Sequence, residues 1–128
     1  MNIVVFFSGT GTNLQSILQN EKKLNYKVIS TFTNNPDASG IDISKNFNVD
    51  CKILDHKKFD SREKFDEEIN VYLQKLNPDY VILAGYMRIL SNFLVEKWKQ
   101  KIINIHPSLL PKYPGPVSYT HLRAHETA

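Results

Sequence analysis

The chain has 128 residues, enough for one domain with a single core, and its 41% hydrophobic and 23% charged residues are ordinary for a soluble globular protein. A net charge of +3 with scattered lysines favours neither a nucleic-acid nor a membrane partner, and no apolar run approaches the length of a membrane span. The single cysteine, Cys51, excludes an internal disulfide and, with no signal peptide at the amino terminus, predicts a cytoplasmic protein.

Strand-like and helix-like segments alternate along the chain. The apolar run at 3–7 predicts a strand covered on both faces, and helical spacing begins after the glycine-containing turn that follows it. Further strands are predicted at 28–33, 51–54, 80–84 and 102–105, with helices at 39–46, 61–76 (capped by Ser61) and 93–98. This alternation implies right-handed crossovers, and therefore an α/β fold with a Rossmann-like open parallel sheet of about five strands and flanking helices.

The most informative segment, 103–115, takes a buried strand into a proline-rich loop. Side chains two residues apart on a strand share a face, so Asn104 and His106 are expected to project together. Pro107 argues against a continuing interior strand, which places His106 at the carboxyl end, where open α/β sheets bind ligands. An amide donor beside an imidazole suits acyl transfer, which needs an oxyanion stabiliser and a general acid or base.

Two other segments have both a functional and a structural interpretation. The turn Ser8–Leu14 offers backbone N–H groups at a helix start for a phosphate, or is simply a tight turn that needs glycine. It is not a dinucleotide fingerprint, because Leu14 replaces the third glycine. The segment Met87–Leu90 follows a predicted strand and is either a ligand-facing loop or a connector. We interpret Cys51 as a small core residue and His56, in a lysine-rich loop, as solvated.

The motifs Ser8–Leu14, Ala84–Leu90 and Asn104–Pro111, in this order, resemble the phosphoribosylglycinamide formyltransferase family of purine synthesis. The resemblance covers residues 1 to about 115. It implies an enzyme that transfers a formyl group from the co-substrate 10-formyltetrahydrofolate to the amine of phosphoribosylglycinamide. Both substrates are small molecules, and no metal is required.

The resemblance also implies a role for individual residues. Asn104 would donate a hydrogen bond to the developing oxyanion, and His106 would supply a proton as the folate nitrogen leaves. A substrate site for the ribose phosphate would be formed by Gly11, Thr12, Asn13 and Pro107. A folate site would be formed by Arg62, Met87, Arg88, Ile89, Leu90 and Asn104.

Because the resemblance stops near residue 115, we expect 1–115 to be the amino-terminal part of a formyltransferase domain and 116–128 to be a non-native tail. Residues 117–127 can be encoded by a sequence that resembles a transposase-type sequencing adapter. The family uses a later aspartate to keep the histidine protonated, and no residue here matches it, so we expect the fragment to be inactive. Two alternatives stay open: another formyl-folate enzyme, such as methionyl-tRNA formyltransferase or formyltetrahydrofolate hydrolase, and a non-catalytic domain that binds a phosphate ligand.

Overall fold

A computed structural model describes residues 1–105 of the chain. Their helices and strands are, in order, β1 (Asn2–Phe7), α1 (Thr12–Gln19), α2 (Glu21–Leu24), β2 (Lys27–Thr33), α3 (Gly40–Asn46), β3 (Cys51–Ile53), the 3₁₀ helix η1 (His56–Lys58), α4 (Arg62–Leu76), β4 (Tyr80–Ala84), α5 (Asn92–Lys97) and β5 (Ile102–Ile105). The strands form one five-stranded sheet in the order β3-β2-β1-β4-β5, with every pair parallel. The predicted α/β fold with a parallel sheet is therefore confirmed.

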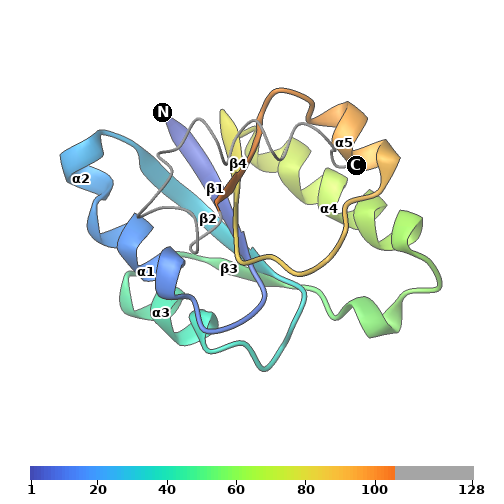
Figure 1. Cartoon of the computed structure of the whole chain (residues 1–128), viewed down its shortest axis with the longest axis horizontal. Coiled ribbons are helices and arrows are strands. Elements are labelled where there is room, and N and C mark those ends of the chain that lie inside the picture. Colours follow the sequence, from blue (N-terminus) through green and yellow to red (C-terminus); the bar gives the residue numbers. More distant parts are fainter. Residues whose placement is uncertain (106–128) are drawn as a thin grey trace.

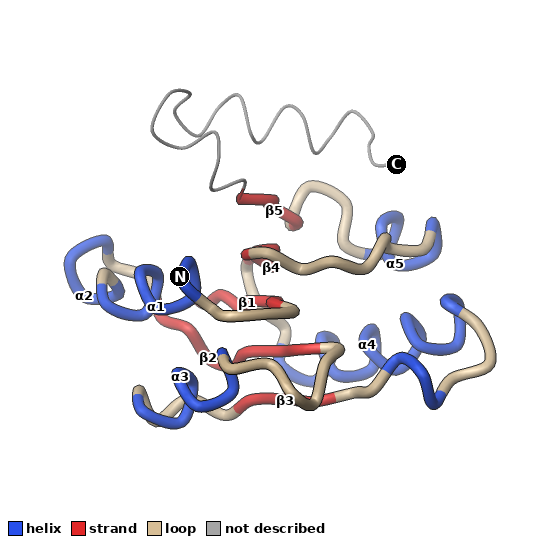
Figure 2. Tube along the Cα trace, turned by 60° about the horizontal axis from the view of Figure 1, so that its bottom comes forward, coloured by secondary structure: helices blue, strands red, loops and turns tan. Residues whose placement is uncertain are grey.

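The helices cover both faces of this sheet. Figure 1 shows α1, α2 and α3 on one side and α4 and α5 on the other, and Figure 2 shows the same separation along the stacked strands. The chain moves outward from β1 through β2 to β3, and then crosses to β4 and β5 on the other side of β1. Right-handed crossovers in opposite directions put their helices on opposite faces, which accounts for the two helical layers.

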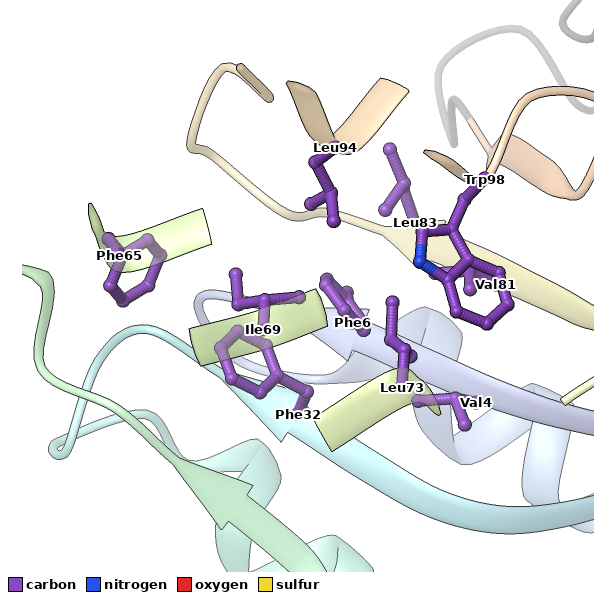
Figure 3. Packing of buried hydrophobic residues seen from close by; sticks show 10 residues of the cluster. All are labelled: Val4, Phe6, Phe32, Phe65, Ile69, Leu73, Val81, Leu83, Leu94 and Trp98. Atoms are coloured by element: carbon purple, nitrogen blue, oxygen red, sulfur yellow. The ribbon is translucent and has the colours of Figure 1, made fainter. Parts of the chain in front are cut away.

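The central strand β1 supplies side chains to both layers. Val4 and Phe6 pack in a cluster with side chains of α4 and α5, whereas Val5 and Phe7 pack in a second cluster with side chains of α1. The first cluster is drawn in Figure 3, where Phe6 lies between the strands and α4, and its ring centre is 4.6 Å from that of Phe32. Such alternation explains why residues 3–7 are apolar without interruption.

The longest helix, α4, has the boundaries that the sequence predicts. Ser61 Oγ accepts a hydrogen bond from the Lys64 N–H at 3.1 Å, which satisfies one of the free donors of the first turn. Asn77 ends the helix in the left-handed conformation, at φ 47°. Ile69 and Leu73 are completely buried against the sheet, so truncating either to alanine is expected to cost about 2–5 kcal/mol.

Two short helices were not predicted. The helix α2 has only four residues and no buried side chain, so it carries no apolar periodicity. Its place is fixed by a polar contact, in which a Glu21 carboxylate oxygen accepts from the Val28 N–H at 2.7 Å. The 3₁₀ helix η1 begins where Asp55 accepts from the Lys57 N–H at 3.0 Å.

Candidate functional site

The carboxyl ends of the strands form the edge of the sheet where the sequence places the candidate site. The strand order reverses between β1 and β4, because their crossovers lead away in opposite directions. Open α/β sheets bind ligands in the crevice at such a reversal. The turn after β1 and the loop after β4 both begin there. On β5, Asn104 pairs in register with Leu83 of β4, close to the same edge.

The turn after β1 ends at Gly11, which is the N-cap of α1 and has φ 78°. No side chain of the described residues caps this helix, so its first N–H groups have no side-chain acceptor there. Thr12 is exposed, Asn13 is half-buried, and the Thr12 hydroxyl lies 3.2 Å from that of Thr10. Free N–H groups and the positive end of the helix dipole suit an anion such as a phosphate.

Gly11 also has a packing role. A Cβ on Gly11 would lie 2.9 Å from the Cα of Gly40 in α3, and a Cβ on Gly40 would lie 2.5 Å from the ring of Phe7. A Cβ on Gly9 would have nothing within 4 Å. The requirement for glycine at position 11 is therefore explained by helix packing and backbone conformation, and its contact with a ligand stays a prediction.

The loop after β4 alternates between exposed and inward side chains. Met87 and Ile89 are 79% and 67% exposed, which leaves two apolar side chains in solvent at the candidate site. Arg88 points inward, with its guanidinium carbon 5.6 Å from the ring centre of Phe65, and Leu90 packs on the cluster beside α4. The segment is thus a connector with inward side chains that also presents an apolar surface.

A buried carboxylate connects this loop with α4. Asp66 is only 1% exposed, and its Oδ2 accepts from the Ser91 N–H at 2.6 Å. Burial raises the pKa of Asp66, while the hydrogen bonds from Ser91 and the charges of Arg88 and Arg62 act in the opposite direction. Arg62 itself is exposed at the first position of α4. The charges of both arginines of the predicted folate site therefore favour the ionised form of this one carboxyl group.

The strand β5 determines the direction of Asn104. Ile103 and Ile105 pack against the cluster on the α1 side of the sheet. Because side chains alternate along a strand, Asn104 faces the α4 and α5 side, where it is half-buried. His106 and Pro107 lie outside the described residues, so the shared face of Asn104 and His106 stays a prediction.

Three side chains at this edge were missed as site residues. Ser8 Oγ accepts from the Met87 N–H at 2.8 Å and donates to Asn34 Oδ1 at 2.6 Å, and Asn34 Nδ2 lies 3.2 Å from His56 Nδ1. The expectation that His56 is merely solvated is wrong, because it is half-buried and packs edge-on against Phe65 with ring centres 6.3 Å apart. The one sequence signal for Ser8, Asn34 and His56 is that each of them follows the end of a strand, at the carboxyl edge of the sheet.

The remaining titratable side chains give no sign of metal or nucleophilic chemistry in residues 1–105. No group of three or more His, Cys, Asp and Glu side chains in that range could hold a metal ion. Cys51 is half-buried beside the second cluster, and burial raises the pKa of its thiol, as expected of a core residue. Within the same range no helix combines the length and apolar character needed to cross a membrane.

Comparisons with known proteins identify the family of the chain. The formyl transferase family model matches residues 1–127, a range that includes the segment we interpret as a non-native tail. The chain is 44% identical to the phosphoribosylglycinamide formyltransferase of Escherichia coli (strain K12), over 98% of this chain and 59% of that protein. It is 39% identical to the Haemophilus influenzae protein of the same name, over 91% of this chain and 56% of that protein.

A solved structure shows the same fold. Glycinamide ribonucleotide transformylase 1 from Geobacillus kaustophilus superposes with a TM-score of 0.79 and 36% identity, over 89% of this chain and 62% of that chain. The chain spans about three fifths of the length of each of these three relatives. The domain boundary at residue 115 stays a prediction. Since the family model covers nearly every residue and the sheet has the same fold, the chain belongs to the formyl transferase family.

Proposed function

We propose that the full-length protein transfers a formyl group from 10-formyltetrahydrofolate to the amine of phosphoribosylglycinamide in purine synthesis. The family membership and the names of the relatives support this proposal. The observation that carries it is that three motifs meet at one edge of the sheet: the uncapped start of α1, the exposed loop after β4, and Asn104 on β5. The proposal involves two small molecules, and neither a nucleic acid nor a membrane. The cytoplasm is the location predicted from the sequence.

The start of α1 is the proposed site for the ribose phosphate. Gly11, Thr12 and Asn13 would provide N–H groups at the positive end of the helix dipole, and the exposed Thr12 hydroxyl adds a donor. Pro107 would line the same substrate. A dianionic phosphate is stabilised there by donors that need no rearrangement, since no side chain of the described residues caps the helix.

The loop after β4 is the proposed site for the folate. Its exposed side chains, Met87 and Ile89, offer an apolar surface to the flat pterin, and its backbone offers hydrogen-bonding groups. Leu90 supports the loop from the core side. Arg62 is exposed at the start of α4, where its positive charge suits the carboxylates at the other end of a folate, while Arg88 of the same predicted site points inward onto Phe65.

The proposed reaction is direct acyl transfer. The amine nitrogen of phosphoribosylglycinamide forms a bond to the formyl carbon, and the carbonyl oxygen becomes an oxyanion that Asn104 stabilises by donating from its side-chain amide. The oxyanion then re-forms the carbonyl as the bond from this carbon to the folate nitrogen breaks. The folate nitrogen takes a proton from His106, and the proton lost by the attacking amine passes to solvent. No step uses a metal ion.

Kinetics of the full-length enzyme test the proposal. Asn104→Ala and His106→Ala should each lower kcat by about 10²-fold, the usual scale for losing an oxyanion donor or a general acid, with smaller changes in substrate binding. The exposed residue Asn46 at the end of α3 provides a matched control, Asn46→Ala, which should keep normal kcat. Near-normal turnover in His106→Ala would overturn the mechanism. Release of formate without formyl transfer to the amine would instead indicate a hydrolase.

A further inference from the structure

A continuous line of hydrogen bonds crosses the carboxyl edge of the sheet. It runs from the Met87 N–H after β4 to Ser8 Oγ after β1, on to the side chain of Asn34 after β2, and ends at His56 Nδ1 after β3. The donor–acceptor distances are 2.8, 2.6 and 3.2 Å. The line therefore joins the loops of four neighbouring strands in their spatial order.

The directions of the first two hydrogen bonds in this line are determined by their donors. A backbone N–H can only donate, so Ser8 Oγ accepts from Met87 and its own proton is directed to Asn34 Oδ1. This orientation turns the Asn34 amide nitrogen, which is only a donor, toward His56 Nδ1. His56 Nδ1 also lies 3.4 Å from the Asn34 carbonyl oxygen, so the ring contacts both the side chain and the backbone of Asn34. Asn34 thus orients the Ser8 hydroxyl, and His56 orients Asn34.

The backbone of Ser8 is held separately from its side chain. The Ser8 N–H donates to the Gly85 carbonyl oxygen at 3.2 Å, and the Ser8 carbonyl oxygen accepts from Asn35 Nδ2 at 3.2 Å. Ser8 is also 7% exposed, so it offers a rigid and nearly dry acceptor. Removing its hydroxyl leaves these backbone contacts in place and releases mainly the Met87 amide.

The loop after β4 is held through two backbone amides. The Met87 N–H donates to Ser8 Oγ, and the Ser91 N–H donates to Asp66 Oδ2. Met87 is itself one of these two attachment points, and Ile89 lies between them in the sequence; both side chains are exposed. The hydroxyl of Ser8 therefore holds the backbone of Met87 in position at the edge of the sheet.

We propose that Ser8, oriented by Asn34, is a positioning residue for the formyl-folate co-substrate, because it holds the Met87 backbone where the loop after β4 meets the pterin. This inference rests on the proposed function. Ser8 does not touch the reacting atoms. It fixes the folate-facing loop relative to the turn that begins the nucleotide site, and so sets the distance between the two substrates.

The test measures binding and kinetics of Ser8→Ala in the full-length enzyme. A lost hydrogen bond to a buried backbone amide should raise the KM for 10-formyltetrahydrofolate about tenfold and leave the KM for phosphoribosylglycinamide nearly unchanged. Ser8→Thr keeps the hydroxyl and should restore most of the folate affinity. Asn34→Ala should shift the same parameter in the same direction by a smaller factor. Ser16→Ala, at an exposed serine of α1, is the matched control and should behave as the unmodified enzyme.

Hydrogen exchange at the Met87 amide separates this inference from the function it rests on. We expect exchange at Met87 to become about tenfold faster in Ser8→Ala, with Ser91 unchanged, because only the first contact is lost. Unchanged exchange at Met87, or an equal rise in both KM values, would overturn the role given to Ser8. Absence of formyl transfer by the unmodified full-length enzyme would instead overturn the proposed function, and with it any role of Ser8 in that reaction.

Discussion

Replacement of Gly11 by alanine tests whether this glycine serves mainly to pack α1 on α3. The residue has φ 78°, a conformation that costs an alanine about 1–2 kcal/mol. The new Cβ would lie 2.9 Å from the Cα of Gly40, and relieving such overpacking costs about 1–3 kcal/mol. The lower entropy of the unfolded alanine chain returns about 0.4–1 kcal/mol. The net loss of stability is therefore expected to be about 1–5 kcal/mol, which is a large fraction of the total stability of a typical domain, about 5–15 kcal/mol.

The fluorescence of Trp98 provides the assay. It is the only tryptophan in the chain and is 6% exposed, so its emission should change when the core opens in urea. Gly9→Ala is the matched control, because its Cβ would meet nothing within 4 Å and its change should stay within about 0.5 kcal/mol. Equal unfolding midpoints for Gly11→Ala and Gly9→Ala would refute the packing argument.

Three further outcomes are expected. Burial raises the pKa of Asp66 above its unfolded value, so the folded state binds more protons and this residue makes the free energy of unfolding fall as pH rises from about 4 through the raised pKa. Asp66→Asn should reduce this pH dependence of stability in urea titrations, and an unchanged pH dependence would contradict the raised pKa of Asp66. Thr12→Val should weaken phosphoribosylglycinamide binding several-fold in calorimetry without changing folate affinity, and an equal loss for both ligands would exclude a nucleotide-specific role. Ser61→Ala should cost about 1 kcal/mol in the same urea assay, because the Lys64 N–H loses its cap, and no loss would mean that water replaces it.

The fold was predictable because its strongest signals are local. The strands β1 and β4 are continuous apolar runs, and α4 has its cap, its apolar face and its stop signal within one stretch of sequence. The helix α2 carries no comparable signal, since none of its four residues is buried. Local pattern also predicted where the turn after β1 and the loop after β4 would lie, because the carboxyl ends of parallel strands share one edge.

Contacts between distant residues were not predictable in the same way. Ser8 and Met87 are 79 residues apart, and they meet only because β1 and β4 are neighbours in the sheet. Asp66 looks like a solvated residue of an amphipathic helix, yet it is buried by Ser91 and its loop, 25 residues further along. Hydrophobic periodicity does not specify strand order, so it cannot identify the partner of a polar side chain across that order.

The central position of β1 has a consequence for synthesis of the protein. The strand β1 leaves the ribosome before both of its neighbours and acquires the second of them only when β4 has been made, since the Asn2 N–H donates to Asp79 Oδ2, 77 residues later. At roughly 5–20 residues per second, this interval lasts about 4–15 s. During that time one edge of an almost wholly apolar strand is uncovered, a state that attracts chaperones and other nascent chains. Ribosome-arrested chains that end before and after β4 should therefore differ in protease resistance of the β1 segment.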